Sequence, residues 1–139
     1  AFGVVYKGRY RGADVVVKVA KNTDEDYESD AYRDAVRQLE RDVAQLAALP
    51  AHTYVVRFFG VIHCDAEFGV VLGYCDAGAL DTALYGARSK RVNFTPAQLV
   101  GIASNVAHGT AHLHANGVIH RDLAARNVLL TKDRVAMIA

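Results

Sequence analysis

Tryptophan is absent from this sequence, and cysteine and proline are scarce, with two of each among 139 residues. Cys64 and Cys75 do not have the spacing of a metal site, so both are expected to be reduced thiols. Neither charge is in clear excess, because the formal net charge is +1. This balance argues against a nucleic-acid partner and against an acidic tail.

Long hydrophobic runs are also missing. The apolar stretches are broken by charged residues and are shorter than the about 20 residues that span a membrane. We therefore expect no membrane segment in this chain. We also expect a cytoplasmic location, either as a separate protein or as the cytoplasmic domain of a larger one.

The first half of the chain alternates short apolar runs with turns, which is typical of β-strands. Arg11-Gly12 is a natural tight turn between the first two runs. An acidic, polar stretch then leads into a helix over 31–49, in which apolar residues recur at helical spacing up to Pro50. The strands expected in this half cover residues 3–10, 13–20, 54–62 and 67–74.

Helices dominate the second half, after the break at Asp76-Ala77-Gly78. The longest of them has a clear start signal: Thr95 and Gln98 form a capping-box pattern, and Pro96 suits the first helical position. The elements expected in this half are a short helix over 79–86, a long helix from Thr95 to about Asn116-Gly117, and short strands over 128–131 and 134–138.

Three histidines of the long helix, His108, His112 and His114, raise one alternative. Histidines at helical spacing can hold a metal ion. No fourth ligand converges on them in the sequence, so a metal site is not our expectation here.

Residues 120–127 read His-Arg-Asp-Leu-Ala-Ala-Arg-Asn and are the most specific signal in the chain. They resemble the catalytic loop of the eukaryotic protein kinases, H-R-D-L-x-x-x-N. The resemblance implies that Asp122 receives the proton of a substrate hydroxyl and that Asn127 binds Mg²⁺, with Arg126 in the same catalytic group. It also implies ATP and Mg²⁺ as cofactors and a protein as the substrate.

Further motifs, in the order that kinases have them, resemble the parts that bind the nucleotide. Val15-Val16-Val17-Lys18 resembles V-A-I-K, which implies that Lys18 pairs the α- and β-phosphates of ATP. The start of the chain resembles the end of a glycine-rich loop, and the segment after Val71 resembles a hinge. The residues that the resemblance places around the nucleotide are Gly3, Val5, Val16, Lys18, Leu72, Gly73, Tyr74, Cys75 and Leu129.

The acidic partner of Lys18 departs from the family pattern. Kinases carry a glutamate at fixed distances before two buried apolar residues, and Leu46 and Leu49 fit those two places. This puts Asp42, which is shorter by a methylene group, at the glutamate position of the nucleotide site. Glu40 is the alternative, but it flanks the opposite edge of the apolar face of the helix.

The resemblance covers essentially the whole chain and implies an α+β, protein-kinase-like bilobal fold that is truncated. We expect a strand-rich N-lobe over 1–72, a hinge over 73–78 and the first part of a helical C-lobe over 79–139. The first glycines of the glycine-rich loop would precede residue 1, and the D-F-G motif would follow Ala139. We therefore expect the full-length parent to be an active kinase and the 139-residue chain alone to be inactive.

The residues after Asp122 indicate the acceptor. Serine/threonine kinases usually carry a lysine where this chain has Ala124, whereas tyrosine kinases often carry an arginine where it has Arg126. The motif therefore favours tyrosine. Tyrosine-kinase-like enzymes that phosphorylate serine or threonine carry the same string and are one alternative. A nucleotide-binding or scaffolding pseudokinase, suggested by Asp42, is another, whereas Arg121 disfavours a small-molecule phosphotransferase.

Overall fold

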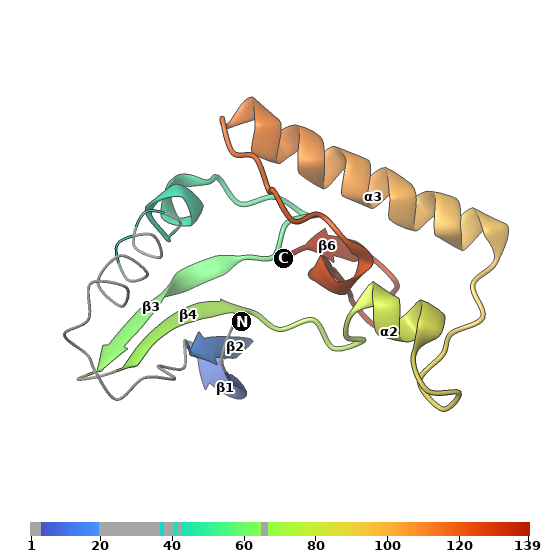
Figure 1. Cartoon of the computed structure of the whole chain (residues 1–139), viewed down its shortest axis with the longest axis horizontal. Coiled ribbons are helices and arrows are strands. Elements are labelled where there is room, and N and C mark those ends of the chain that lie inside the picture. The colour runs from blue at the N-terminus through green and yellow to red at the C-terminus, as the bar shows by residue number, and fades with distance from the viewer. Residues whose placement is uncertain (1–3, 20–36, 38–40, 42, 65–66) are drawn as a thin grey trace. The chain divides into compact units, whose positions relative to one another are not determined.

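The computed structural model describes residues 4–19, 37, 41, 43–64 and 67–139 (Figure 1). The chain divides into two compact units, which are described separately. Unit 1 comprises Ala1–Leu49 and Arg57–Tyr74, and unit 2 comprises Pro50–Val56 and Cys75–Ala139. Three residues of the predicted nucleotide site and its alternatives lie outside the described residues: Gly3, Glu40 and Asp42.

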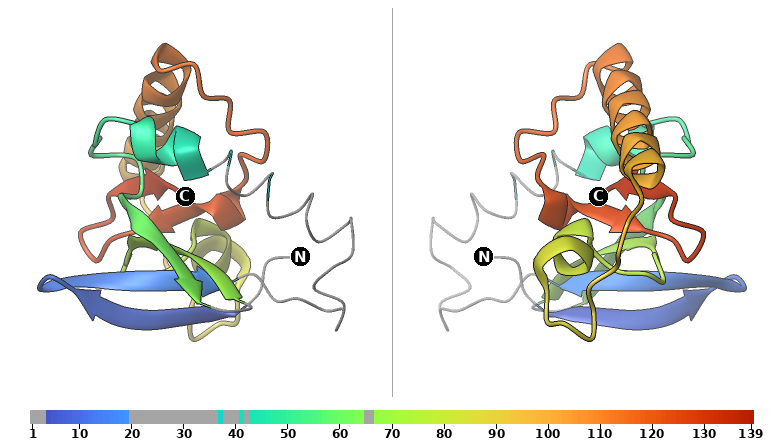
Figure 2. Two further views of the ribbon diagram at one scale, coloured as in Figure 1. Left: turned by 90° about the vertical axis from the view of Figure 1, so that its left-hand side faces the viewer. Right: turned by 90° about the vertical axis from the view of Figure 1, so that its right-hand side faces the viewer.

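The described part of unit 1 contains an antiparallel sheet with the strand order β1-β2-β4-β3. Two adjacent strands, β1 and β2, form a hairpin (Figure 2). Its turn residues, Arg11 and Gly12, have φ angles of 49° and 84°, as a two-residue hairpin turn needs, so the predicted turn is confirmed. The strands are β1 (Val5–Tyr10), β2 (Ala13–Val19), β3 (Phe58–Cys64) and β4 (Glu67–Gly73).

The strand predicted over 54–62 is wrong at its start, because β3 begins at Phe58. Val55 instead forms a parallel bridge with Ile138, and the Val56 N–H donates to the Ile138 carbonyl at 2.8 Å. Pro50–Val56 therefore groups with unit 2, although the first lobe was expected to include it. The residues look like a strand, but their pairing partner lies far along the chain. The lobe boundaries stay a prediction.

The helix predicted over 31–49 is confirmed in the part that the structure describes. Residues 43–48 are helical, and the helix ends before Pro50. Its last turn is tightened, because the Leu49 N–H donates to the carbonyl of Leu46, three residues back, at 3.3 Å.

Unit 2 combines helices with a small sheet. Its two α-helices and two strands lie within two residues of their predicted bounds, whereas its 3₁₀ turn was not predicted. These elements are α2 (Leu80–Tyr85), α3 (Pro96–Ala115), the 3₁₀ turn η1 (Ala125–Asn127), β5 (Val128–Leu130) and β6 (Ala136–Ile138). Burial of apolar side chains stabilises this unit. One cluster of buried residues in its core consists of Ala83, Ile102, Val128, Leu130 and Ala136. Among the described residues, no helix is both long enough and apolar enough to cross a membrane.

The start of α3 confirms the predicted capping box. The Gln98 N–H donates to Thr95 Oγ1 at 3.3 Å, and the Thr95 N–H donates to Gln98 Oε1 at 2.9 Å. Farther along, Gly109 brings the helix close to Pro50–Val56, since a Cβ there would lie 2.6 Å from the Tyr54 carbonyl oxygen. The helix ends just before Gly117, whose φ of 73° suits a glycine.

Candidate active site

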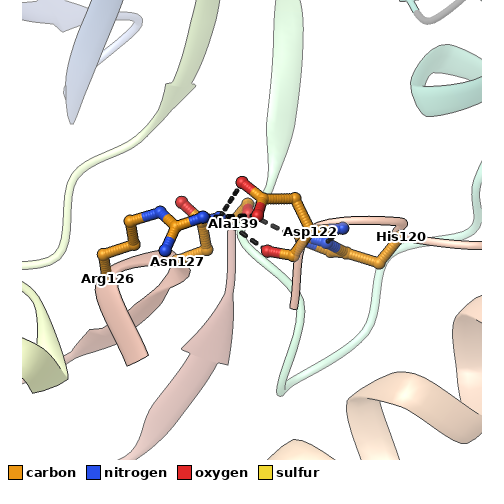
Figure 3. A network of polar contacts seen from close by, with 5 residues as sticks. All are labelled: His120, Asp122, Arg126, Asn127 and Ala139. Atoms are coloured by element: carbon orange, nitrogen blue, oxygen red, sulfur yellow. Dashed lines mark hydrogen bonds and ion pairs between the residues drawn. The ribbon is translucent and has the colours of Figure 1, made fainter. Parts of the chain in front are cut away.

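The side chains of the predicted catalytic loop converge on Asp122 (Figure 3). The Arg126 Nη2 atom lies 2.5 Å from Asp122 Oδ1. The Asn127 Nδ2 atom donates to the backbone carbonyl of Asp122 at 2.7 Å and to its Oδ2 at 2.9 Å. The structure thus brings together Asp122, Arg126 and Asn127, three of the four residues that the sequence assigned to catalysis. The fourth, Lys18, lies on a strand of unit 1, and the roles of all four stay predictions.

Two local backbone features produce this arrangement. The tight turn η1 places Arg126 and Asn127 back over Asp122, and the Asn127 N–H donates to the Ala124 carbonyl at 2.8 Å. Arg121, which directly precedes Asp122, has a φ of 64°. This value lies in the left-handed region, which residues other than glycine rarely adopt. Such a residue costs about 1–3 kcal/mol, and strain of this kind clusters at functional sites.

His120 fixes the loop to Ala139, the residue that follows β6. Its Nε2 lies 2.9 Å from the Ala139 carbonyl oxygen, and its Nδ1 accepts the Asp122 N–H at 3.3 Å. A carbonyl only accepts and an amide only donates, so the ring carries its proton on Nε2. The Ala139 N–H also donates to the Asn127 carbonyl at 2.8 Å. Sequence reasoning gave His120 no role, although it is the first letter of the motif.

The Asp122 carboxylate is accessible although both its oxygens are bound. Its side chain is 62% exposed, and each oxygen keeps a lone pair for a further donor. An exposed ion pair such as Arg126–Asp122 adds little stability, so its main effect is to orient the carboxylate. The loop can therefore present an oriented base to a hydroxyl group.

Asn127 fits a role in binding Mg²⁺. Its Nδ2 is occupied by Asp122, and in the described part of the chain no hydrogen bond to its Oδ1 is found. An oxygen atom is the ligand that Mg²⁺ prefers, usually with phosphate oxygens and water. The described residues contain no group of three or more His, Cys, Asp or Glu side chains that could hold a metal. Mg²⁺ bound at Asn127 would therefore need phosphate oxygens and water as its other ligands.

Four nucleotide-site candidates on the strands of unit 1, Val5, Val16, Lys18 and Leu72, share one face of its sheet. Val5 lies opposite Lys18, and Val16 lies opposite Leu72. Directly opposed residues on antiparallel strands point to the same face, as do residues two apart such as Val16 and Lys18. Val15 points to the other face and is buried in the core. The sheet therefore places three apolar side chains around one lysine.

Gly73 and Tyr74 are tied to unit 1 through their backbone. The Gly73 N–H donates to the Arg57 carbonyl at 2.8 Å, and the Tyr74 N–H donates to the Asp14 carbonyl at 3.2 Å. The Lys7 Nζ atom lies 3.9 Å from the centre of the Tyr74 ring, a cation–π contact. These contacts fix the path of the chain where β4 ends.

Cys75 and Leu129 are held within unit 2. The Cys75 side chain is buried, and its Sγ lies 3.8 Å from Met137 Sδ. Burial, and then the charge of Asp76, raise the pKa of the Cys75 thiol. Leu129 lies on β5 opposite Met137 and forms a bridge with Ala79. Cys75 therefore fits the role of an inert, buried residue.

Comparison with known proteins identifies the family. The sequence model of the protein tyrosine and serine/threonine kinase family matches residues 1–139. The chain therefore belongs to this family, which confirms the resemblance drawn from the 120–127 motif. The α+β kinase fold class is confirmed with it.

Three relatives show how the similarity extends. The chain is 33% identical over 140 residues to a probable LIM domain-containing serine/threonine-protein kinase of Dictyostelium discoideum, covering 99% of this chain and 20% of the relative. It is 34% identical over 131 residues to the RAF proto-oncogene serine/threonine-protein kinase of Xenopus laevis, covering 94% and 18%. It is 34% identical over 130 residues to the RGS domain-containing serine/threonine-protein kinase A of Dictyostelium discoideum, covering 94% and 11%. The chain thus spans a fifth or less of these relatives.

Proposed function

We propose that this chain is part of a protein kinase that transfers the γ-phosphate of ATP to a hydroxyl group of a protein. The observation that carries the proposal is the exposed Asp122 carboxylate, held on one oxygen by Arg126 and on the other by Asn127. In the transfer, the acceptor oxygen forms a bond to the γ-phosphorus, and the bond from that phosphorus to the ADP oxygen breaks. The proton of the acceptor goes to Asp122.

The other candidates position these groups. Arg126 and Asn127 orient the carboxylate, while His120 holds the backbone of the loop through Ala139. Asn127 Oδ1 would hold a Mg²⁺ ion, which neutralises charge on the phosphates when it is bound. With its base already oriented, the loop has little to reorganise during the transfer.

The nucleotide would be held by the candidates outside the loop. Lys18 would bind its phosphates, and the apolar side chains around Lys18 on the sheet of unit 1 would contact the base. The other residues proposed for this site stay predictions from the resemblance: Gly3, Asp42, Gly73, Tyr74, Cys75 and Leu129. Of these, Cys75 has its side chain buried, so it would act through its backbone.

The acceptor hydroxyl has two candidates. The Ala124 and Arg126 pattern favours tyrosine, whereas the relatives described above are named serine/threonine kinases. Because the similarity covers 94–99% of this chain, we propose serine or threonine as the acceptor and keep tyrosine as the alternative. Phosphoamino-acid analysis of a labelled protein substrate separates the two.

The test is a phosphorylation assay with labelled ATP and a mixed protein substrate. It uses the full-length protein that contains this chain, here called the intact protein, because the 139 residues alone are expected to be inactive. Asp122→Asn keeps the shape of the side chain but removes the base, so labelling should fall about 10²-fold or more. Asp133→Asn is the matched control, because Asp133 is an exposed turn residue of the same unit. It should leave the rate unchanged. No labelling by the wild-type protein would overturn the proposal and favour the pseudokinase alternative.

A further inference from the structure

A cluster of rings joins Pro50–Val56 to α3 within unit 2. The His52 ring is stacked on the His112 ring, with centroids 4.4 Å apart and planes at 15°. The Tyr54 ring lies edge-on to His52 at 5.6 Å, and the His108 ring lies 6.0 Å from Tyr54. We call these four residues the imidazole cluster: His52, Tyr54, His108 and His112. The proposed catalysis leaves them without a role.

The hydrogen bonds of the cluster define where the protons are. His112 Nε2 lies 2.9 Å from the Pro50 carbonyl oxygen, which only accepts, so this nitrogen carries a proton. His52 Nδ1 lies 3.2 Å from the Tyr54 amide nitrogen, which only donates, so Nδ1 is unprotonated. A proton added to His52 must go to Nδ1. It would then face the Tyr54 N–H, and the hydrogen bond would be lost.

The surroundings of His52 also disfavour its charged form. The pKa of His52 is lowered first by burial, then by His112 and then by His108. These two histidines come from α3, and Tyr54 from the same segment is the other titratable group in ring contact with His52. β6 meets this segment through backbone hydrogen bonds with Tyr54 and Val56. Among the described residues, no carboxylate contributes to the lowered pKa.

The cluster is connected to the catalytic loop through β6. The Tyr54 carbonyl accepts the Ile138 N–H at 2.9 Å. The next residue, Ala139, donates its N–H to the Asn127 carbonyl at 2.8 Å and accepts from His120. One hydrogen bond and one peptide unit therefore separate Tyr54 from the residue that anchors the loop.

We propose that His52 and His112 are positioning residues that hold β6, and through it the Asp122 loop, only while His52 is neutral. The stacked rings and the His112–Pro50 hydrogen bond hold Pro50–Val56 on α3. The Tyr54–His52 bond fixes the conformation of this segment, and the segment holds β6. Proton uptake by His52 breaks the bond to Tyr54 and loosens β6. The effect on catalysis rests on the proposed kinase function, whereas the hold on β6 does not.

The sign of the pH dependence follows from the lowered pKa. An unfolded or loosened segment lets His52 take up a proton at its ordinary pKa of about 6.5, whereas the closed cluster resists protonation. The closed form is therefore fully favoured above that pH and is lost as the pH falls below it. For one proton, the loss reaches at most about tenfold per pH unit.

Hydrogen exchange of the intact protein tests the hold on β6. It is followed by mass spectrometry between pH 7.5 and 5.5 and corrected for intrinsic exchange rates. The readout is protection in peptides that cover 54–56 and 136–139. His52→Asn is the decisive variant, because its Oδ1 can accept the same amide two residues on and does not titrate. His114→Asn is the matched control, an exposed histidine of α3 outside the cluster.

In the wild-type protein and in His114→Asn, protection of these peptides should decrease as the pH is lowered. In His52→Asn, protection should not change with pH. The same pH-dependent loss in His52→Asn would overturn the proposal. His112→Phe gives a second check, because it keeps a ring against His52 but removes one of the groups that lower the pKa of His52. The gap between the pKa of His52 in the closed and open forms then narrows, so the loss of protection at acidic pH should be smaller than in the wild-type protein, and a larger loss would contradict the proposal.

The rate of phosphotransfer at pH 7.5 and 6.0 tests the link to catalysis. His52→Asn should keep a larger fraction of its kcat at pH 6.0 than the wild-type protein and His114→Asn. If all three proteins keep the same fraction of kcat at pH 6.0 while the exchange result is as expected, the proposed link to Asp122 is overturned. The proposed hold on β6 then still stands. If no activity is found at any pH, the proposed kinase function is refuted. The hydrogen-exchange experiment would still decide whether His52 and His112 hold β6.

Discussion

The side-chain nitrogen of Asn127 binds Asp122 at two points, its backbone carbonyl at 2.7 Å and its Oδ2 at 2.9 Å. One residue thus fixes both the backbone and the carboxylate of the proposed base. Because the same side chain offers its Oδ1 to Mg²⁺, the base and the metal ligand are coupled. A change in one is expected to displace the other.

Asn127→Asp tests this coupling. The change replaces the donor with a second carboxylate beside Asp122, so like charges repel where a hydrogen bond was. Although it keeps an oxygen for Mg²⁺, the variant should lose about 10-fold or more in kcat, the usual effect of breaking the hydrogen bond between a metal ligand and its partner. Asn93→Asp, the same change at an exposed loop position, is the control. Equal rates for both variants would show that the two contacts of Asn127 do not matter.

Gly109 and Gly101 are a matched pair on α3. An alanine Cβ at 109 would lie 2.6 Å from the Tyr54 carbonyl oxygen and 3.0 Å from Ile138 Cδ1, whereas at 101 nothing lies within 4 Å. Gly109→Ala should therefore destabilise the protein by about 1–3 kcal/mol. Gly101→Ala should stabilise it by about 0.5–1 kcal/mol, because alanine loses less backbone entropy in a helix.

Urea denaturation of the two glycine variants measures both effects. A Gly109→Ala variant as stable as Gly101→Ala would mean that α3 does not approach Tyr54 as closely as described. The same result would weaken the argument for a hold on β6, since that hold needs Pro50–Val56 to lie against α3.

Cys75 should react slowly with alkylating reagents. Burial and Asp76 raise the pKa of its thiol, so less of the reactive thiolate is present near neutral pH. In a Cys64→Ser background, iodoacetamide at pH 8 should modify the folded protein at least about tenfold more slowly than the urea-unfolded protein. Mass spectrometry over time gives both rates. Equal rates would show that Cys75 is as accessible and as readily ionised in the folded protein as in the unfolded one.

Local signals in the sequence predicted much of the fold. Thr95 and Gln98 lie three residues apart, and their hydrogen bonds depend only on that spacing, so the start of α3 could be predicted. The same holds for the Arg11-Gly12 turn, where a two-residue connection demands φ values that glycine supplies. The three catalytic-loop residues also lie within six positions of one another, so a motif describes them.

Contacts between distant segments could not be predicted in this way. Val55 and Val56 resemble the start of a strand, but they pair with Ile138 far along the chain. The stack of His52 on His112 likewise joins two segments, and only His112 attracted attention in the sequence. The anchoring of His120 by Ala139 has the same origin. Sequence periodicity reports the type of an element, whereas these contacts depend on how elements pack.

The most direct test of the account compares the wild-type protein with Asp122→Asn in two measurements: the transfer rate at saturating ATP and Mg²⁺, and the affinity for ATP. Asp122 is proposed to act on the acceptor hydroxyl and not on the nucleotide. The rate should therefore fall about 10²-fold or more, while the ATP affinity stays within about twofold. An unchanged rate, or a loss of rate explained by lost ATP affinity, would contradict the assignment of Asp122 as the base.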